Sequence, residues 1–272
     1  MPRRRTRTQR KARADLTGWM IIGGVVLVLG LVTSVWLEQR KTNPELDRAT
    51  LCPAQGPASV TVVLIDATDD LSAPQARDFQ NQLERLRAEI PRHGLLEVFL
   101  VSETGDGLLQ PTLSLCNPGR GRGVNEFVGN PQRTEARWRT AFQTPLEEAF
   151  QLAVSPSATS RSPILESIQS VALTALQPAE RLGLARKLIV VSDLMQHTEA
   201  ISFYRGLPEA GALVASFAFR QARTDLRGID VELWMLQRPA LSVRTQGALA
   251  QLWEGLIREQ GGRVVRIYNV SG

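Results

Sequence analysis

The stretch VTVVLID, residues 60–66, decides the fold class of this chain. It is a short run of β-branched and aliphatic residues without charge until it ends in the carboxylate of Asp66. Such a run is typical of a parallel strand that is buried on both faces of a sheet. The stretch KLIVVSD, residues 187–193, is built in the same way and also ends in an aspartate, Asp193. We therefore predict two buried parallel strands, each followed directly by a carboxylate.

The segments around these two stretches alternate between strand and helix patterns. From Ala73 onward, Phe79, Leu83 and Leu86 recur at helical spacing with charged residues between them, which predicts an amphipathic helix. This alternation predicts an α/β fold, a doubly wound and mostly parallel sheet with helices on both faces, over residues 59–272. Further helices are predicted at 134–153, at 163–176 and from 247, further strands at 95–101, around Leu113, at 211–219, 229–237 and 264–268, and a loop rich in Gly and Pro at 117–133.

An uncharged apolar run, WMIIGGVVLVLGLVTSVWL at residues 19–37, precedes this domain. As a helix that rises ~1.5 Å per residue it spans about 28 Å, close to the hydrocarbon thickness of a bilayer. Trp19 and Trp36 stand near its two ends, where aromatic side chains prefer the headgroup level. The run is therefore predicted to be a transmembrane helix. Residues 38–58 are polar and contain prolines, which predicts a linker between this helix and the domain.

The positive charge of the chain is concentrated in front of the apolar run. Seven basic residues against Asp15 give the first fifteen residues a charge of +6, whereas the whole chain carries +5. The rest of the chain therefore sums to −1. Nucleic-acid binding would require clustered positive charge on the folded domain, so the sequence argues against that class of function.

The same basic residues predict the topology. Positively charged flanks stay in the cytoplasm, so residues 1–18 are predicted to form a cytoplasmic tail of an inner-membrane protein. The domain is then predicted to lie in the periplasm, on the assumption that the host has an outer membrane. A cleaved signal peptide and a buried core helix are the alternatives. The length of the run and the lack of a small-residue cleavage site argue against the first, and the charge in front argues against the second.

The two cysteines, Cys52 and Cys116, both fall on the translocated side of the membrane in this topology. A disulfide between them would persist in an oxidising compartment. Two free thiols are the alternative, because two cysteines carry no spacing information. Neither their spacing nor a neighbouring histidine indicates a zinc site.

Oxygen-bearing side chains stand at the predicted strand ends. Asp66, Thr68 and Asp70 alternate in the loop after the first strand, Ser162 precedes a predicted helix, and Asp193 follows the later strand. Ligands of open α/β sheets bind at the carboxyl ends of strands. Carboxylate and hydroxyl oxygens that converge in this way suit a hard divalent cation such as Mg²⁺. The alternative is that these residues only form turns and cap helices.

These three segments resemble the metal-ion-dependent adhesion site of the von Willebrand factor A family, which has an Asp-x-Ser-x-Ser loop, a distant Thr and a later Asp. The resemblance covers roughly residues 59–270. It implies an envelope protein partner whose acidic side chain completes the metal shell. At the first loop the chain departs from the family, because a carboxylate replaces a hydroxyl and Asp69 adds another, which would weaken the ion as a Lewis acid. The implied Mg²⁺ ligands are Asp66, Thr68, Asp70, Ser162 and Asp193.

The predicted function is therefore a membrane-anchored, von Willebrand factor A-like protein-binding module of the cell envelope, and not an enzyme. One alternative is a metal-free structural subunit of an envelope or secretion-type assembly. Another is a phosphatase-like hydrolase with Asp66 as nucleophile, although that family needs a second Asp where this chain has Thr68. His197 follows the strand that carries Asp193 and is predicted to lie in a surface loop.

Overall fold

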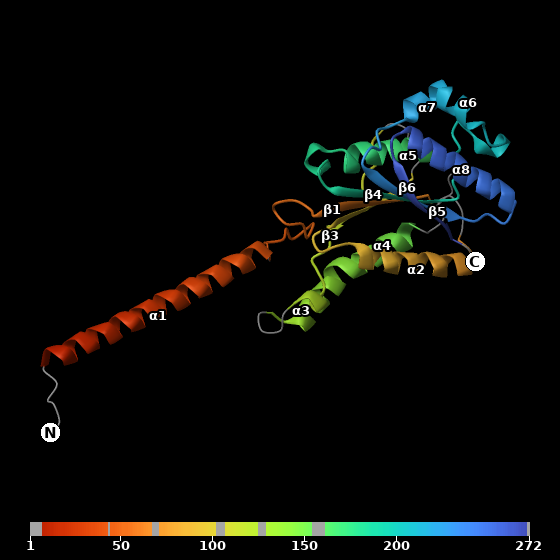
Figure 1. Ribbon diagram of the computed structural model, residues 1–272. Helices are drawn as coiled ribbons and strands as arrows, with labels where there is room; N and C mark the ends of the chain where they lie inside the picture. The colour runs from red at the N-terminus through yellow and green to blue at the C-terminus, as the bar shows by residue number, and fades with distance from the viewer. Residues whose placement is uncertain are drawn as a thin grey trace. The chain divides into compact units, whose positions relative to one another are not determined.

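The computed structural model describes six stretches of the chain. The chain divides into two compact units, with the boundary between Glu45 and Leu46. The first unit holds one long helix, and the second holds a sheet with the helices that cover it (Figure 1). The residues that the structure describes are 7–42, 44–66, 71–101, 107–124, 129–153 and 161–270.

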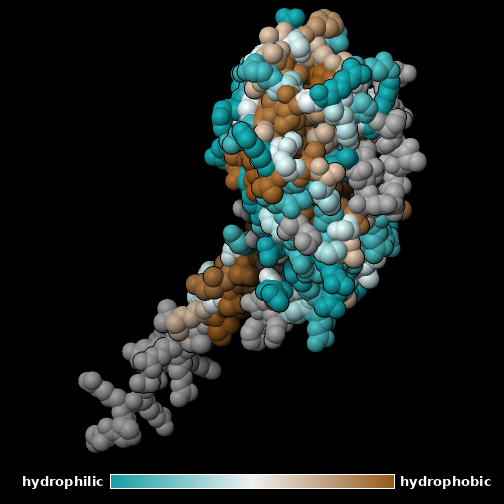
Figure 2. Space-filling view, turned by 90° about the vertical axis from the view of Figure 1, so that its right-hand side faces the viewer, coloured by the Kyte–Doolittle hydropathy of each residue, from teal (hydrophilic) through white to brown (hydrophobic). Residues whose placement is uncertain are grey.

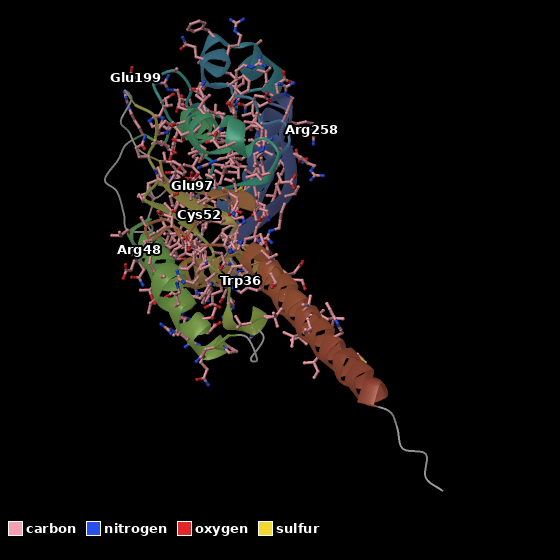
Figure 3. All side chains as sticks on the ribbon, turned by 90° about the vertical axis from the view of Figure 1, so that its left-hand side faces the viewer. Trp36, Arg48, Cys52, Glu97, Glu199 and Arg258 are labelled. Atoms are coloured by element: carbon pink, nitrogen blue, oxygen red, sulfur yellow. A yellow bond between two sulfur atoms is a disulfide. The ribbon has the colours of Figure 1, made fainter. Side chains whose placement is uncertain are left out.

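The first unit consists of helix α1, Arg7–Thr42. Its segment Gly18–Glu38 is the one helix in the described part of the chain that is long and apolar enough to cross a membrane. None of the apolar side chains of this segment is buried within the structure. Trp36 stands near its end, as Figure 3 shows. The predicted helix is therefore present, and its exposed apolar surface is what a lipid-facing segment requires.

The second unit is built on a six-stranded sheet in the order β3-β2-β1-β4-β5-β6. All neighbouring strands are parallel except β3, which runs antiparallel to β2 at one edge. This order and direction confirm the predicted doubly wound, mostly parallel sheet. The strands are β1 Ser59–Ile65, β2 Leu95–Leu100, β3 Leu113–Cys116, β4 Ala185–Ser192, β5 Ile229–Leu236 and β6 Arg263–Val270.

Helices cover both faces of this sheet (Figure 1). α2 Ala73–Glu89, α3 Pro131–Trp138 and α4 Thr144–Ala153 lie on one face. The other face carries α5 Ile164–Val171, α6 Ala210–Ala215, α7 Phe217–Ala222 and α8 Val243–Glu259. Short helical segments extend or join these helices: η1 Gly121–Gly123, η2 Arg139–Gln143, η3 Ala172–Leu176, η4 Ala179–Arg181 and η5 Phe203–Arg205.

Each face of the sheet has its own hydrophobic core. Val62 and Leu64 of β1 contribute to the cluster beneath α5 and α8, whereas Val63 and Ile65 contribute to the cluster beneath α2 and α4. The strand is therefore buried on both faces, as its uninterrupted apolar sequence predicts. Trp253 of α8 is fully buried within the first of these clusters.

The predicted strand at 211–219 is wrong, because these residues form α6 and α7. The side chain of Glu209 accepts hydrogen bonds from the amides of Gly211 and Ala212 at the start of α6, at 3.0 and 2.7 Å. Ser216 caps α7 by accepting from the amide of Phe219 at 3.1 Å. These two caps and the alanine-rich composition favour helices over an extended run.

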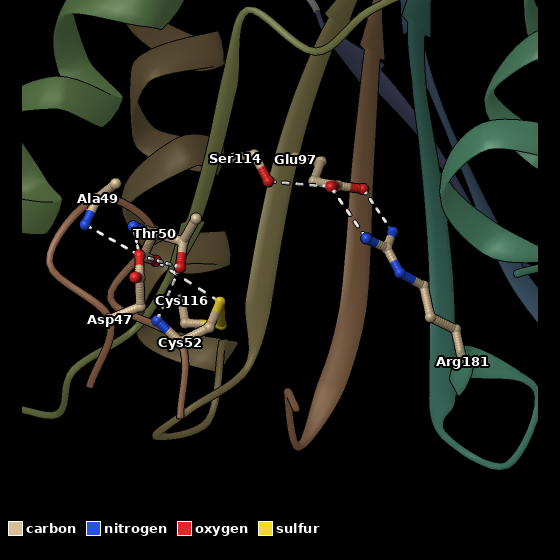
Figure 4. The surroundings of a disulfide bond; sticks show 8 residues. All are labelled: Asp47, Ala49, Thr50, Cys52, Glu97, Ser114, Cys116 and Arg181. Atoms are coloured by element: carbon tan, nitrogen blue, oxygen red, sulfur yellow. Dashed lines mark hydrogen bonds and ion pairs between the residues drawn. A yellow bond between two sulfur atoms is a disulfide. The ribbon is translucent and has the colours of Figure 1, made fainter. Parts of the chain in front are cut away.

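The expected linker differs from the structure over its second half. The domain unit begins at Leu46, and Leu51 is buried against the core on the α2 face. Asp47 accepts hydrogen bonds from the amides of Ala49 and Thr50, which fixes a turn (Figure 4). These bonds hold the pKa of Asp47 below its usual value.

A disulfide joins this turn to the edge of the sheet. Cys52 and Cys116 are bonded, so of the two alternatives that the sequence left open the structure has the disulfide and not two free thiols (Figure 4). The amide of Cys116 also donates to the carbonyl of Thr50 at 2.8 Å. The segment that follows α1 is thus attached covalently to β3.

Candidate functional site

The candidate site lies at the carboxyl ends of the two neighbouring strands β1 and β4. Ile65 pairs with Val191 in the parallel register, and the amide of Asp66 donates to the carbonyl of Val191 at 2.9 Å. Asp66 therefore lies directly beside Ser192 and Asp193, at the end of β4. The two strand-end carboxylates that the sequence predicts are brought to one place.

Asp66 is a buried carboxylate held by two hydroxyl groups. Only 3% of the residue is exposed. Its Oδ2 accepts a hydrogen bond from Ser162 Oγ at 2.6 Å and another from Ser192 Oγ at 2.9 Å. Such short bonds to a charged acceptor are stronger than bonds between neutral groups, so they compensate much of the cost of burying the carboxylate.

Ser162 reaches this carboxylate from the segment in front of α5. The N-cap position of α5 is taken by Pro163, where no side-chain cap bond forms, so Ser162 does not act as the cap of this helix. The amide of Leu165 instead donates to Gln196 Oε1 at 2.9 Å. Gln196 thus accepts a hydrogen bond from the first turn of α5, and the hydroxyl of Ser162 donates to Asp66.

Asp193 is the second buried carboxylate of the site, with 6% of the residue exposed. Its Oδ1 accepts from the amide of Met195 at 2.8 Å, and its Oδ2 forms an ion pair with Nε of Arg238. Arg238 follows the end of β5, the next strand of the sheet. Three adjacent strands therefore each deliver a charged side chain to the same edge.

The backbone after Asp193 is strained. Leu194 has φ of 65°, in the left-handed region that a non-glycine residue enters at a cost of about 1 kcal/mol. The amide of Leu194 donates to Ser192 Oγ at 2.8 Å, and its carbonyl accepts from Trp253 Nε1 at 2.8 Å. These bonds stabilise the turn that directs the side chain of Asp193 toward Arg238.

Two aromatic rings connect Arg238 back to Ser162. The guanidinium of Arg238 lies over the ring of Tyr204 at 5.4 Å, and this ring meets that of His197 edge-on at 5.2 Å. The backbone of His197 exchanges hydrogen bonds of 2.8 and 3.0 Å with that of Ser162. His197 therefore lies in the loop after β4, as predicted, and is half-buried beside the site.

Three of the five predicted metal ligands, Asp66, Ser162 and Asp193, are brought together, while Thr68 and Asp70 lie outside the described residues. Within the described ranges, no group of three His, Cys, Asp or Glu side chains is placed to hold a metal ion. The described oxygens of Asp66 and Asp193 bind hydroxyls, an amide and a guanidinium. This donor set fits Mg²⁺ only in part, because an arginine already neutralises one of the two carboxylates.

Sequence reasoning missed Arg238, Ser192 and Tyr204. The signal for Arg238 was available, because it follows a predicted strand as Asp66 and Asp193 do. The signal for Tyr204 was not, since its contact with Arg238 joins residues whose proximity depends on the folded loop after β4.

Figure 2 shows the side of the domain on which β6 ends. This side is the carboxyl edge of the sheet. Apolar patches interleave with polar side chains on this face. Tyr204 is 51% exposed at the rim of the site, and Val243 at the start of α8 is 88% exposed. Aromatic and arginine side chains that are partly open to solvent are enriched where proteins bind one another.

A cavity of about 510 Å³ lies at the amino ends of the strands, at the edge of the sheet opposite to the candidate site. Lys187 in its wall pairs with Glu89 of the wall at 3.5 Å and with Glu232 at 2.9 Å, and Arg263 pairs with Asp230 at 2.6 Å. Arg186, the remaining charged residue of the wall, donates to the carbonyls of Leu176 and Arg227 at 3.0 and 3.2 Å, so the charged side chains of this cavity are engaged within the protein.

No protein-family model matches the chain, and no curated protein matches it. Among solved structures, an aerotolerance-related membrane protein from Bacteroides fragilis with multiple mutations to serines is similar at 14% identity, over 79% of this chain and 92% of that one, with a TM-score of 0.41. BatB, a conserved hypothetical protein from Bacteroides thetaiotaomicron, is similar at 16% identity over 78% and 91%, also with a TM-score of 0.41.

The class of this protein rests on its own architecture. It is an α/β domain with a doubly wound sheet and a buried acid and hydroxyl site at the carboxyl edge. A helix of membrane-spanning length precedes this domain.

Proposed function

We propose that this protein is a membrane-anchored protein-binding module of the cell envelope, whose carboxyl edge docks a protein partner. The observation that carries the proposal is the convergence of Asp66, Ser162, Asp193 and Arg238 from separate elements onto one edge. Buried charged groups that are arranged this closely, beside exposed aromatic and aliphatic side chains, are typical of a binding site rather than of a solvated surface.

The anchor and the topology belong to the same proposal. The segment Gly18–Glu38 of helix α1 spans the inner membrane, the basic residues before this segment stay in the cytoplasm, and the domain lies in the periplasm. The disulfide between Cys52 and Cys116 supports this side for the domain, because such bonds persist in oxidising compartments and are rare in the cytoplasm.

Binding without catalysis is favoured by the state of Asp66. A hydrolase of the phosphatase type would use this carboxylate as nucleophile. Here its Oδ2 accepts two hydroxyl hydrogen bonds, at 2.6 and 2.9 Å, and the carboxylate is buried. The two hydroxyl bonds withdraw charge from this oxygen and lower its reactivity toward a phosphate ester, and the burial restricts access to it, which supports a positioning role.

Two forms of the binding site follow from the resemblance to the von Willebrand factor A family. In the first, Asp66, Thr68, Asp70, Ser162 and Asp193 hold Mg²⁺, and the ion would supply a Lewis acid for an acidic group of the partner. In the second, the site works without metal, as a structural subunit of an envelope assembly would. The ion pair between Arg238 and Asp193 favours the second form.

Site-specific photo-crosslinking of the full chain in its native membrane tests the proposed docking edge. We would introduce Val243→p-benzoylphenylalanine at the carboxyl edge and, as a matched control, Leu182→p-benzoylphenylalanine in the loop before β4. Both side chains are exposed, at 88% and 55%. A discrete adduct from position 243 that is absent from position 182 and lost on Asp66→Ala supports the proposal. Equal adducts from both positions, or none from 243, would overturn it.

A further inference from the structure

We infer that the guanidinium of Arg238 is the resident cation of the carboxyl-edge site and stands where the family resemblance places a divalent metal ion. The inference deepens the proposed function and rests on it for the site's role in docking. The claim about the cation itself concerns only this chain. Its consequence is that the two described carboxylates of the site, Asp66 and Asp193, have their charges balanced without a metal.

The first step is the charge of the buried groups. Asp66 and Asp193 place two carboxylates side by side at adjacent strand ends, and both are more than nine-tenths buried. Carboxylates that are this close and this buried require a cation or several donors. The hydroxyls of Ser162 and Ser192 serve Asp66, and Arg238 supplies the positive charge at Asp193.

The second step is that the backbone holds Arg238 in place. The carbonyl of Arg238 accepts hydrogen bonds from Gln246 Nε2 and from the amide of Leu241, both at 3.0 Å. The carbonyl of the preceding Gln237 accepts from Gln75 Nε2 at 2.7 Å. Bonds from α2 and α8 thus fix the loop on both sides of Arg238. Because the backbone of Arg238 is fixed, less conformational entropy is lost when its guanidinium pairs with Asp193.

The third step is that the contacts around Arg238 form a closed ring of neighbouring residues. Arg238 pairs with Asp193 and lies over Tyr204, Tyr204 contacts His197, and the backbone of His197 bonds that of Ser162. Ser162 and Ser192 both donate to Asp66, and Ser192 Oγ lies 3.5 Å from Asp193 Oδ1, which closes the ring of contacts. Removing the guanidinium from Asp193 would open this ring of contacts, and the cation–π contact with Tyr204 would be lost.

The fourth step is competition with a metal. Mg²⁺ binds carboxylate oxygens directly, at about 2.1 Å and in a strict octahedral arrangement. To do so through Asp193 Oδ2 it would have to displace Arg238, whose positive charge would remain a few Å away and repel the ion. The arginine therefore both satisfies the carboxylate and excludes the competing cation.

Calorimetric titration of the full chain in detergent with Mn²⁺ and with Mg²⁺ tests the inference. The variants are Arg238→Gln, which removes the cation, and Arg258→Gln, which removes an exposed arginine of α8 that is 72% exposed at its side chain. We expect no saturable binding to the wild-type protein or to Arg258→Gln. Arg238→Gln should bind the ion saturably, with a dissociation constant at least about tenfold below the highest concentration at which the wild-type protein shows no binding, because the repulsion of a neighbouring unit charge is lost.

The double variant Arg238→Gln with Asp193→Asn should lose the gained binding, which assigns the ion to this site. If the wild-type protein binds metal as tightly as Arg238→Gln, the inference is overturned, and it is equally overturned if Arg238→Gln gains no binding. Should Arg238→Gln fail to fold, Arg238→Met offers a second removal of the charge with its stem retained.

The same crosslinking used for the proposed function separates the two claims. The adduct from position 243 should persist in EDTA if Arg238 is the resident cation, whereas a metal-dependent site would lose it. Failure of the crosslink in every condition would refute the docking edge but leave the titration result standing.

Discussion

Glu97 is a buried carboxylate in β2, 5% exposed, whose charge is balanced by one arginine. Arg181 donates to its two oxygens at 2.8 and 3.3 Å, and Ser114 of β3 donates to it at 3.0 Å (Figure 4). Arg181 also donates to the carbonyl of Ala175 at 2.6 Å. The pair therefore joins β2 to the segment that leads into β4, and removing either partner leaves the other without its counter-charge.

We expect Arg181→Ala to lower the free energy of unfolding by about 3–5 kcal/mol, because it leaves a buried charge uncompensated. Arg258→Ala is the matched control, since Arg258 lies on the exposed face of α8 and forms a pair with Glu254 worth about 0.5 kcal/mol (Figure 3). Urea denaturation of the two variants beside the wild type measures the difference. Losses of similar size in both would contradict the structural role of Glu97.

Glu232 of β5 is a second buried carboxylate, and it gives the domain a defined response to acid. Burial alone would raise its pKa, but hydrogen bonds from Trp234 Nε1 and from Lys187, together with the charges of Lys187 and Arg266, hold the pKa below the usual 4.5. A carboxylate with a lowered folded pKa contributes stability above its unfolded pKa and loses it as pH falls through the folded value. The stabilisation is therefore present at neutral pH and is lost below about pH 4.5.

Glu232→Gln should therefore cost about 2 kcal/mol of unfolding free energy at pH 7, the usual range for a hydrogen bond to a charged group. The deficit relative to wild type should shrink as the pH falls from 5 to 3, where the wild-type carboxylate becomes protonated as well. Thermal melts of both proteins across this range measure it. A deficit that stays constant with pH would show that the charge of Glu232 adds nothing.

At the scale of elements, the disulfide is the bond that ties the segment after α1 to the sheet. Cys52 and Cys116 close a loop with a sequence separation of 64 residues. In the chain-entropy account, a loop of this length stabilises the folded state by about 4 kcal/mol. The bond fastens β3, the short antiparallel strand at the edge, which pairs only with β2 in the described sheet.

Replacing both cysteines, Cys52→Ser with Cys116→Ser, should lower the unfolding free energy by about 4 kcal/mol. The wild-type protein treated with a reductant should show a similar loss, which controls for the substitutions themselves. Denaturation monitored by tryptophan fluorescence follows the change. If reduction leaves the midpoint unchanged, the segment before β1 would be held by Leu51 and its other contacts alone.

The elements also show what local sequence patterns decide. Strands β1 and β4 were predicted because an apolar run buried on both faces leaves a plain signal, and α2 because its apolar residues recur at helical spacing. Residues 211–219 were mistaken for a strand because a short apolar run suits both structures until caps such as Glu209 are recognised. In the site, Asp66 and Asp193 followed from their places at strand ends. The pairing of Arg238 with Asp193 depends on β5 lying beside β4, which no local pattern specifies.

For the whole molecule, the charge of the N-terminus and the redox state of the two cysteines both depend on the orientation of the chain in the membrane. If the basic residues keep the N-terminus in the cytoplasm, the domain folds in an oxidising compartment, where Cys52 and Cys116 form their bond. Orientation of a single helix is set by the lysine and arginine residues that flank it. Changing those residues should therefore change the redox state of cysteines that are far away along the chain.

Replacing the seven basic residues among the first thirteen with glutamine should invert part of the population and leave its cysteines reduced. A variant in which the arginines become lysines keeps the charge and is the matched control. Labelling of free thiols with a polyethylene-glycol maleimide under denaturing conditions, without reductant, separates the two states by mass. We expect the wild type and the lysine variant to resist labelling and the glutamine variant to give a doubly labelled fraction. Labelling of the wild-type protein to the same extent would place the domain in a reducing compartment, and the proposed periplasmic side would then be wrong.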